Sequence, residues 1–344
     1  MTTLPTAFSY LLGEPASKAI IRSEPDDFKV IENLGFEPEG QGEHVFLYIR
    51  KTGENTDWVA RQLANFAQIS PKDVSYAGKK DRHAVTEQWF CVKFPIKRNL
   101  NWKLFGGDSI EVLQSVRHPR KLRLGTLQGN RFKIRLRQVT DMRDLQQRAQ
   151  VVSRLGVPNY FGEQRFGQNF ANLDKGIALL KGEFQERQRS KKGIYISAVR
   201  SWVFNQLLSL RIKQGLWDTV LQGDALMLTG SQSCFVEEQL TDELTQRLKA
   251  LDISLTAPLW GRGELMSIGA AREWELQQLA SWGEVTSLLE QLTLMQERRA
   301  LRLLPMNLQI TVEDESTCWV EFDLTSGSFA TSVLRELCDY SQAT

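Results

Sequence analysis

The sequence predicts an α+β fold with a mixed sheet, in which a mainly helical domain is inserted into a discontinuous one. Residues 1–140 contain short segments with the alternating polar and apolar pattern of β-strands. Residues 141–305 instead carry apolar residues at helical spacing. The strand pattern then returns, so the two ends resemble each other more than either resembles the middle. We therefore expect one domain of residues 1–155 and 306–344, with residues 156–305 inserted into it.

The first part of the chain is expected to hold four strands and a helix. The strands are rich in Val, Ile and aromatic residues and cover residues 27–32, 44–50, 89–94 and 110–116. Between the second and third strands, Val59, Leu63 and Phe66 recur at helical spacing and predict a helix over 56–67 with Thr56 as its N-cap. Ser70 followed by a proline indicates a second helix start.

The middle part is expected to contain several amphipathic helices, because apolar residues recur every three or four positions, as in Leu145, Ala149 and Val152. Some strands are expected around 225–236. Beyond residue 305 the pattern predicts two strands and a helix. These cover residues 307–312, 318–324 and 328–338.

Composition narrows the class of protein. The chain has 344 residues, of which 42% are hydrophobic and 24% charged, as in globular proteins that form two domains. No apolar run approaches the roughly 20 residues that a membrane helix needs, and no signal peptide precedes the first strand, so we expect a cytoplasmic protein. The four cysteines and three histidines are too scattered for a metal site, a disulfide framework or a His-dependent nucleophile.

The strongest indication of a nucleic-acid partner is local, because the net charge is only +2. Residues 117–137 hold eight lysines and arginines and no acidic residue. In a strand over the second half of this segment, Arg131, Lys133 and Arg135 would share one face, where phosphates could lie. The alternative is a solvated strand face paired with acids from elsewhere; the absence of acids within the segment favours RNA.

A second basic cluster, residues 187–192, lies in the middle part, with Arg165 and Arg200 not far away in sequence. A surface loop explains this cluster at least as well as RNA binding does. Two basic regions on different domains would nevertheless suit a polyanion, and such binding depends strongly on salt.

The turn Gly78-Lys79-Lys80-Asp81 presents one carboxylate among basic side chains just before a predicted strand. Nearby cations favour the ionised carboxylate, which can attack a sugar carbon or take up a proton without a metal or cofactor. On composition alone, a turn aspartate in a surface salt bridge is the better interpretation.

The surrounding residues supply independent support. The run 74–89 resembles the catalytic motif of the tRNA pseudouridine synthase D family, in which the aspartate that closes a Gly-x-Lys-Asp sequence is the nucleophile. Residues 156–167, GVPNYFGEQRFG, resemble the segment that opens the inserted domain of that family. Further family-like motifs are found at 24–28, 121–125, 129–132 and 327–331, so the resemblance covers nearly the whole chain.

The resemblance implies a pseudouridine synthase catalytic domain with a mixed sheet. It makes Asp81 the nucleophile and makes Phe28, Asn130 and Phe329 contacts of the target nucleotide. Stacking and amide hydrogen bonding suit these residue types, although core packing would also explain the phenylalanines, and a turn would explain Asn130. Arg22 stands where the family usually has a lysine; we consider it as a partner of the catalytic carboxylate or of a phosphate, or as an exposed strand-edge arginine.

The implied activity is isomerisation of uridine to pseudouridine at position 13 of transfer RNA, without a cofactor or metal, and no protein partner is implied. The alternative from another class is a non-catalytic RNA-binding or ribosome-assembly protein, which gives no reason for a carboxylate amid cations. An RNA methyltransferase is a second alternative, but the sequence lacks the glycine-rich turn that would hold the cofactor of such an enzyme. A hydrolytic glycosidase would want a second carboxylate, for which Glu87 is a weak candidate.

Overall fold

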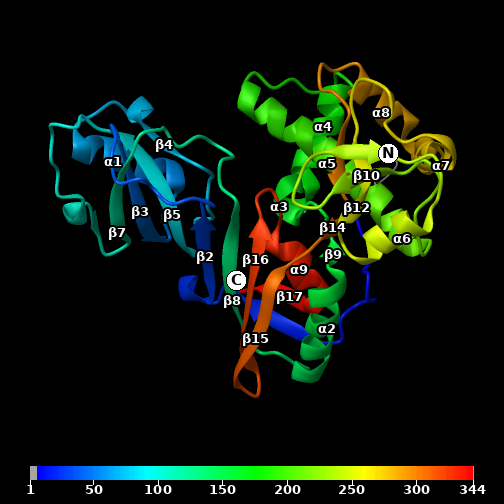
Figure 1. Ribbon diagram of the computed structural model, residues 1–344, viewed down its shortest axis with the longest axis horizontal. Coiled ribbons are helices and arrows are strands. Elements are labelled where there is room, and N and C mark those ends of the chain that lie inside the picture. The colour runs from blue at the N-terminus through cyan, green and yellow to red at the C-terminus, as the bar shows by residue number, and fades with distance from the viewer. Residues whose placement is uncertain (1–5, 344) are drawn as a thin grey trace. The chain divides into compact units, whose positions relative to one another are not determined.

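The computed structural model describes residues 6–343. These residues form two compact units, which we describe separately (Figure 1). The sheet unit comprises residues 15–155, 304–330 and 337–343. The helix-rich unit comprises residues 6–14, 156–303 and 331–336.

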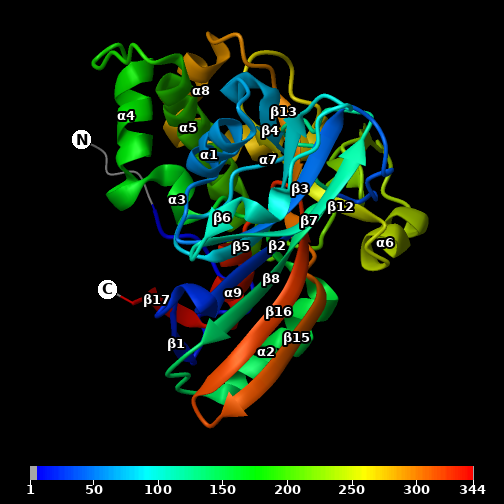
Figure 2. The ribbon, with the colours of Figure 1, turned by 90° about the vertical axis from the view of Figure 1, so that its left-hand side faces the viewer.

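Within the described residues, the sheet unit is built on a nine-stranded sheet (Figure 2). Its strand order is β15 (Met306–Asp314), β16 (Thr317–Thr325), β8 (Gly129–Leu136), β2 (Phe28–Asn33), β5 (Val85–Lys93), β3 (His44–Thr52), β7 (Ile110–His118) and β6 (Gly106–Gly107), and β4 (Val74–Tyr76) also pairs with β5. Strands β2 and β5 are parallel, whereas the other neighbours in this order are antiparallel. The sheet is therefore mixed, and the predicted α+β class and the strands expected in this part are confirmed.

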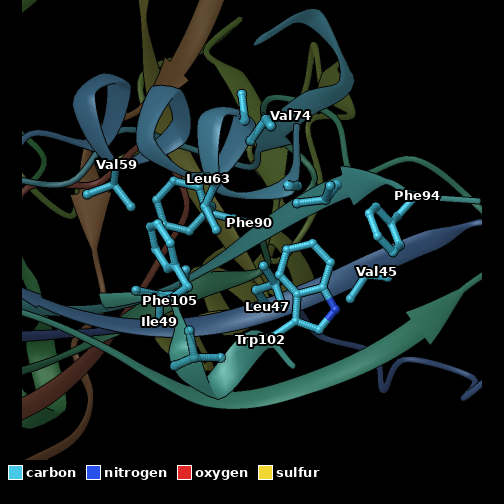
Figure 3. Close-up of a cluster of buried hydrophobic side chains, with 14 of the residues drawn as sticks. Val45, Leu47, Ile49, Val59, Leu63, Val74, Phe90, Phe94, Trp102 and Phe105 are labelled. Atoms are coloured by element: carbon cyan, nitrogen blue, oxygen red, sulfur yellow. The ribbon is translucent and has the colours of Figure 1, made fainter. Parts of the chain in front are cut away.

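Helix α1 (Thr56–Ala67) covers one face of this sheet, and a buried hydrophobic core lies between the helix and the strands (Figure 3). Val59 and Leu63 lie on the apolar side of the helix and join a buried cluster with Leu47 and Phe90. The predicted helix is confirmed, but its predicted cap is wrong. The side chain of Asn55 caps the helix by accepting the backbone N–H of Asp57 at 2.8 Å.

A second, smaller buried cluster includes Ala77, Trp89, Cys91 and Leu122. Leu122 belongs to the loop between β7 and β8, and the backbone N–H of Gly125 in that loop donates to the Ala77 carbonyl at 2.8 Å. The loop therefore fixes the position of the turn that begins at residue 77.

Shorter elements complete the sheet unit. Strand β1 (Lys18–Ile21) pairs in parallel with β17 (Asp339–Gln342), and α2 (Met142–Leu155) packs against β15. Three 3₁₀ helices are found in the described part of this unit, η1 (Pro25–Asp27), η2 (Pro71–Asp73) and η3 (Trp102–Leu104). The helix start expected at Ser70 is thus present, but only as a single turn. The helix expected at the C-terminal end is α9 (Ala330–Leu337), whose residues divide between the two units.

The helix-rich unit is organised around the long helix α5 (Arg189–Lys213), which is buried along most of its length. The other helical elements are α3 (Glu163–Phe166), η4 (Gln168–Phe170), α4 (Ala171–Leu180), α6 (Asp242–Lys249), α7 (Gly269–Leu279), η5 (Ala280–Trp282) and α8 (Gly283–Glu290). Among residues 6–343, no helix combines the length and apolar character required to cross a membrane.

The helix-rich unit also contains strands. Its described residues include a four-stranded sheet in the order β11 (Cys234–Val236), β10 (Ala225–Leu228), β12 (Ile253–Leu259) and β13 (Glu297–Ala300), and a pair of β9 (Val157–Pro158) with β14 (Arg302–Leu303). The strands expected around 225–236 are confirmed, whereas β12 and β13 were not predicted. Nearly all residues of β12 are buried, including the polar Ser254 and Thr256, which alternate with its apolar residues.

Candidate active site

The turn that carries Asp81 connects β4 to β5 and is held by buried polar contacts. The Gly78 carbonyl accepts a hydrogen bond from Gln88 Nε2 at 3.1 Å, and the backbone N–H of Lys80 donates to Thr56 Oγ1 at 3.1 Å. Thr56 Oγ1 in turn donates to Gln88 Oε1 at 2.9 Å. Because Asn55 caps helix α1, the hydroxyl of Thr56 is available for this role. The turn is thus fixed to both α1 and β5.

The Asp81 carboxylate is oriented from two sides. Its Oδ2 accepts a hydrogen bond from the Arg22 guanidinium at 2.6 Å, and its Oδ1 accepts the backbone N–H of His83 at 3.0 Å. Charge-assisted contacts of this kind are among the strongest hydrogen bonds in proteins. The side chain of Asp81 is still 23% exposed, so a ligand can reach the oriented carboxylate.

Arg22 connects Asp81 to Phe28. Its Cζ lies 4.2 Å from the centroid of the Phe28 ring, within the range of a cation–π contact. Arg22 has φ 59°, a left-handed conformation that costs a non-glycine residue on the order of 1–3 kcal/mol. Its Nε is buried without a hydrogen-bond partner among the described residues. The structure thus brings Arg22 into contact with Asp81, and a role of this contact in catalysis stays a prediction.

Phe28 lies in the core at the start of β2. Its residue is 4% exposed, and its ring packs edge-on against Phe132 with centroids 6.4 Å apart. The guanidinium of Arg22 covers one side of the ring. Phe28 is thus packed in the core of this structure, as the alternative interpretation expected. Stacking of its ring on a nucleotide stays a prediction, and it requires the ring to be uncovered.

Asn130 lies within strand β8, so the alternative of a turn residue is wrong. Its register partners are Glu32 on β2 and Leu324 on β16. Its Oδ1 is buried and has no hydrogen-bond partner among residues 6–343. A buried acceptor left without a partner is uncommon and calls for an explanation such as a missing ligand.

Phe329 is partly buried and immediately precedes helix α9. It follows Thr325, which pairs with Gly129, so the loop that carries it starts beside Asn130. Direct contacts thus join Arg22, Phe28 and Asp81. Asn130 and Phe329 are placed by the neighbouring strands β8 and β16.

Two buried charges beside the turn were not identified from sequence. The Glu32 carboxylate has a fully buried side chain, accepts from Lys80 Nζ at 2.5 Å and also accepts the backbone N–H of Trp89 at 3.1 Å. Burial raises the pKa of Glu32, and the adjacent Lys80 ammonium opposes that rise. The second charge is Lys51, whose contacts are described below. Both residues occupy inward-facing positions of their strands, which is the sequence signal that could have revealed them.

The basic strand of residues 129–136 is confirmed, but the interpretation of its cationic row is corrected. The apolar residues Phe132, Ile134 and Leu136 are buried as predicted. The basic residues are each paired with a carboxylate: Arg131 with Asp323 at 2.8 Å, Lys133 with Glu321 at 2.8 Å, Arg135 with Glu313 at 2.5 Å and Arg137 with Asp27 at 2.9 Å. The acids missing from the segment come from elsewhere in the sheet unit, so this row is not a free phosphate-binding strip.

The second basic cluster differs from this row. Residues 187–192 are exposed and include the first turn of α5, which contains no acidic residue. Arg200 instead donates to the backbone carbonyls of Leu259 and Trp260, and Arg165 donates to Ser197 Oγ. The cluster at 187–192 is thus an exposed cationic surface, whereas Arg165 and Arg200 are engaged with neighbouring groups.

Comparison with known proteins identifies the family. The sequence profile described as tRNA pseudouridine synthase D (TruD) matches residues 6–191 and 184–337. The chain is 48% identical over 335 residues to tRNA pseudouridine synthase D of Aeromonas salmonicida (strain A449), covering 97% of this chain and 95% of the relative. The corresponding protein of Aeromonas hydrophila subsp. hydrophila is 46% identical over 335 residues, with the same coverage, and that of Methylococcus capsulatus (strain Bath) is 45% identical over 329 residues, with 95% and 93% coverage.

The fold is also found in a solved structure. A crystal structure of a Methanosarcina mazei protein assigned as tRNA pseudouridine synthase D superimposes with a TM-score of 0.76 and covers 98% of each chain at 22% identity. This similarity supports the α+β fold. From the match of the family profile and the identity to its members, the chain belongs to the tRNA pseudouridine synthase D family.

Proposed function

We propose that this protein isomerises uridine to pseudouridine in transfer RNA and that Asp81 is the catalytic carboxylate. The proposed reaction is based on membership of the tRNA pseudouridine synthase D family. The observation that supports Asp81 is its setting: a partly exposed carboxylate on a rigid turn, bonded to the Arg22 guanidinium at 2.6 Å. The RNA-binding alternative gives no reason for that arrangement.

The reaction rearranges bonds within one nucleotide. The bond between ribose C1′ and uracil N1 breaks, the base turns in the site, C5 bonds to C1′, and C5 then loses its proton while N1 gains one. The product is an isomer of the substrate, so no oxidant, reductant or group donor is needed to balance it. Asp81 either attacks C1′ directly or removes a sugar proton to give a glycal-like intermediate.

The other predicted residues are assigned to binding. The target uridine must leave its stack, which costs a few kcal/mol. We propose that Asn130 hydrogen-bonds the uracil edge, which would give a partner to its buried Oδ1. Phe28 and Phe329 are proposed to stack on the extruded base, and such stacking contributes about 1–3 kcal/mol per base. Arg22 is proposed to keep Asp81 oriented during the reaction.

The roles of the domains follow from the same proposal. Residues 1–155 and 306–344 would form the catalytic domain, and residues 156–305 the inserted domain characteristic of the family. The presence of Asp81, Arg22 and Asn130 in the sheet unit supports this assignment. The target at uridine 13 is proposed from the family resemblance alone.

Tritium release from transfer RNA labelled at uridine C5 tests the function. We expect the wild-type protein to release tritium and Asp81→Asn to release none while still binding RNA. Asp108→Asn, which changes an exposed carboxylate in the turn between β6 and β7, is the matched control and should retain full release.

Each outcome has a distinct meaning. Release by Asp81→Asn at the wild-type rate would overturn the catalytic assignment. Binding without release by the wild-type protein would favour the RNA-binding alternative. Release from a transcript in which uridine 13 is replaced by cytidine would contradict the proposed position.

A further inference from the structure

Lys51 is a charged residue in the interior of the sheet unit. It lies near the end of β3 and is 0% exposed. It continues the inward-facing row formed by Val45, Leu47 and Ile49, which belong to the core beneath α1. Burying an ammonium group among apolar side chains is costly unless its hydrogen bonds are satisfied.

The contacts of Lys51 lead to the catalytic turn. Its Nζ donates to the backbone carbonyl of Glu54 at 2.7 Å and to the backbone carbonyl of Asp81 at 3.3 Å. The two carbonyls belong to different loops, one after β3 and one before β5. The same loops are also joined by Arg82 Nε, which donates to the Gly53 carbonyl at 3.1 Å. Lys51 thus ties the Asp81 backbone to the end of a central strand.

Lys51 differs from the two lysines in the turn itself. Lys79 and Lys80 each pair with a carboxylate, Asp57 at 2.7 Å and Glu32 at 2.5 Å. Among the ion pairs of the described residues, none within 4.0 Å involves Lys51. Its positive charge is therefore not neutralised by direct contact and can act on the charges nearby.

The charges that act on Lys51 include the catalytic carboxylate. Burial lowers the pKa of Lys51 to about 8, and the negative charge of Asp81 is the largest opposing influence. Lys80 lowers the pKa further, whereas Glu54 raises it. The attraction is mutual, so the Lys51 ammonium stabilises the negative charge of Asp81.

We propose that Lys51 is a positioning residue for Asp81, one that holds the backbone of the catalytic turn and supplies a buried positive charge close to the reacting carboxylate. The inference rests on the proposed function of Asp81. It predicts a role in the chemical step and not in the affinity for RNA, because Lys51 is fully buried and cannot contact a phosphate.

The pH dependence follows from the same geometry. Below about pH 8 the amine carries its charge, and above that pH it loses the charge. The rate of the chemical step should therefore fall as pH rises through about 8. A displacement of the catalytic turn by about 1 Å can reduce the rate about 10²-fold. Removal of the Lys51 side chain should therefore lower kcat by about that factor and leave KM little changed.

Two substitutions separate the hydrogen bonds from the charge. Lys51→Gln retains an N–H donor for the carbonyls and removes the charge, whereas Lys51→Met removes both. Lys103→Met, which removes an exposed lysine in η3, is the control. Single-turnover tritium release from pH 6 to 9.5 gives the rates, and far-UV circular dichroism reports whether each variant is folded.

We expect Lys51→Met to lose about 10²-fold in rate, Lys51→Gln to lose less, and both to lack the fall above pH 8 that the wild type and Lys103→Met show. Wild-type rates in both Lys51 variants, or an unchanged alkaline fall, would overturn the proposal. A rise in KM alone would do the same, since it would indicate an RNA contact.

A measurement that needs no activity tests the coupling. The pKa of Lys51 can be followed by NMR of the protein labelled at the lysine side-chain carbons, with Lys51→Met identifying the resonance. We expect Asp81→Asn to lower the pKa of Lys51 further, because the opposing carboxylate charge is lost. An identical titration in the two proteins would overturn the inference. Absence of tritium release by the wild type, with the coupling present, would instead count against the proposed function.

Discussion

Replacement of Glu32 by alanine is predicted to destabilise the sheet unit strongly. The substitution leaves the Lys80 ammonium, whose side chain is 7% exposed, without its carboxylate at 2.5 Å. Removal of one partner of a buried ion pair costs about 3–5 kcal/mol. The backbone N–H of Trp89 also loses its acceptor, which adds about 1 kcal/mol or more. The expected loss is therefore about 4–6 kcal/mol in the free energy of unfolding.

Urea unfolding followed by circular dichroism measures this loss as a lower midpoint with an unchanged slope. Hydrogen exchange of the Trp89 amide gives a local readout, and it should become faster in Glu32→Ala. Glu32→Gln should lose less, because an amide oxygen can still accept from Trp89. The double variant Glu32→Leu with Lys80→Met removes both charges and should be close to the wild type in stability.

Two outcomes of these measurements would refute the expected effect of Glu32→Ala. If Glu32→Ala lowers the free energy of unfolding by less than about 1 kcal/mol, the ion pair of Glu32 and Lys80 contributes no more than an exposed ion pair does. A double variant as unstable as Glu32→Ala would show that the packing of Glu32, and not the unpaired charge of Lys80, carries the effect.

Three further predictions concern the site and the sheet. Arg22→Ala removes a charge-assisted hydrogen bond of about 1.5–3 kcal/mol from Asp81, so tritium release should slow by roughly 10-fold to 10²-fold, and an unchanged rate would exclude a role for this contact. In Gly129→Ala the new Cβ would lie 2.2 Å from the Leu324 carbonyl oxygen; we expect a loss of about 1–3 kcal/mol in urea unfolding, and a wild-type midpoint would contradict the close approach. Burial lowers the pKa of Lys51 from 10.5 to about 8, so the unfolded chain binds the proton of this residue more tightly than the folded chain does. The free energy of unfolding of the wild type should therefore rise by about 3 kcal/mol relative to that of Lys51→Met between pH 8 and 10.5. A difference that stays constant with pH would refute the pKa shift.

The strands were predictable because one side of each faces a core. In β8, the buried Phe132, Ile134 and Leu136 alternate with more exposed residues, and this period of two identifies a half-buried strand. Strand β12 also alternates in sequence, since Ser254 and Thr256 lie between apolar residues, but both of its sides are buried and it was not recognised. The cap of α1 was misplaced by one residue because Asn55 and Thr56 are both good caps, and the choice depends on Gln88, which is distant in sequence.

The site was predictable only in part. Asp81 and Arg22 were identified through their motifs, and the contact between them depends on a fold that brings residues 59 positions apart together. The cationic row of β8 was misinterpreted for the same reason, since its acids lie mostly on β15 and β16. Lys51 and Glu32 were overlooked although each occupies an inward-facing position of its strand, where a charge is unexpected.

The pairing of β8 with β16 has a consequence for synthesis of the chain. Arg131 and its partner Asp323 are 192 residues apart. At about 5–20 residues per second, a ribosome needs roughly 10–40 s to make the intervening segment, and during that time one edge of β8 has no strand beside it. An open apolar edge invites pairing with another chain, and charged side chains along an edge oppose it. Until β16 is made, Arg131 and Lys133 lack the acids with which they pair in the fold, so their charges oppose pairing of this open edge with another chain.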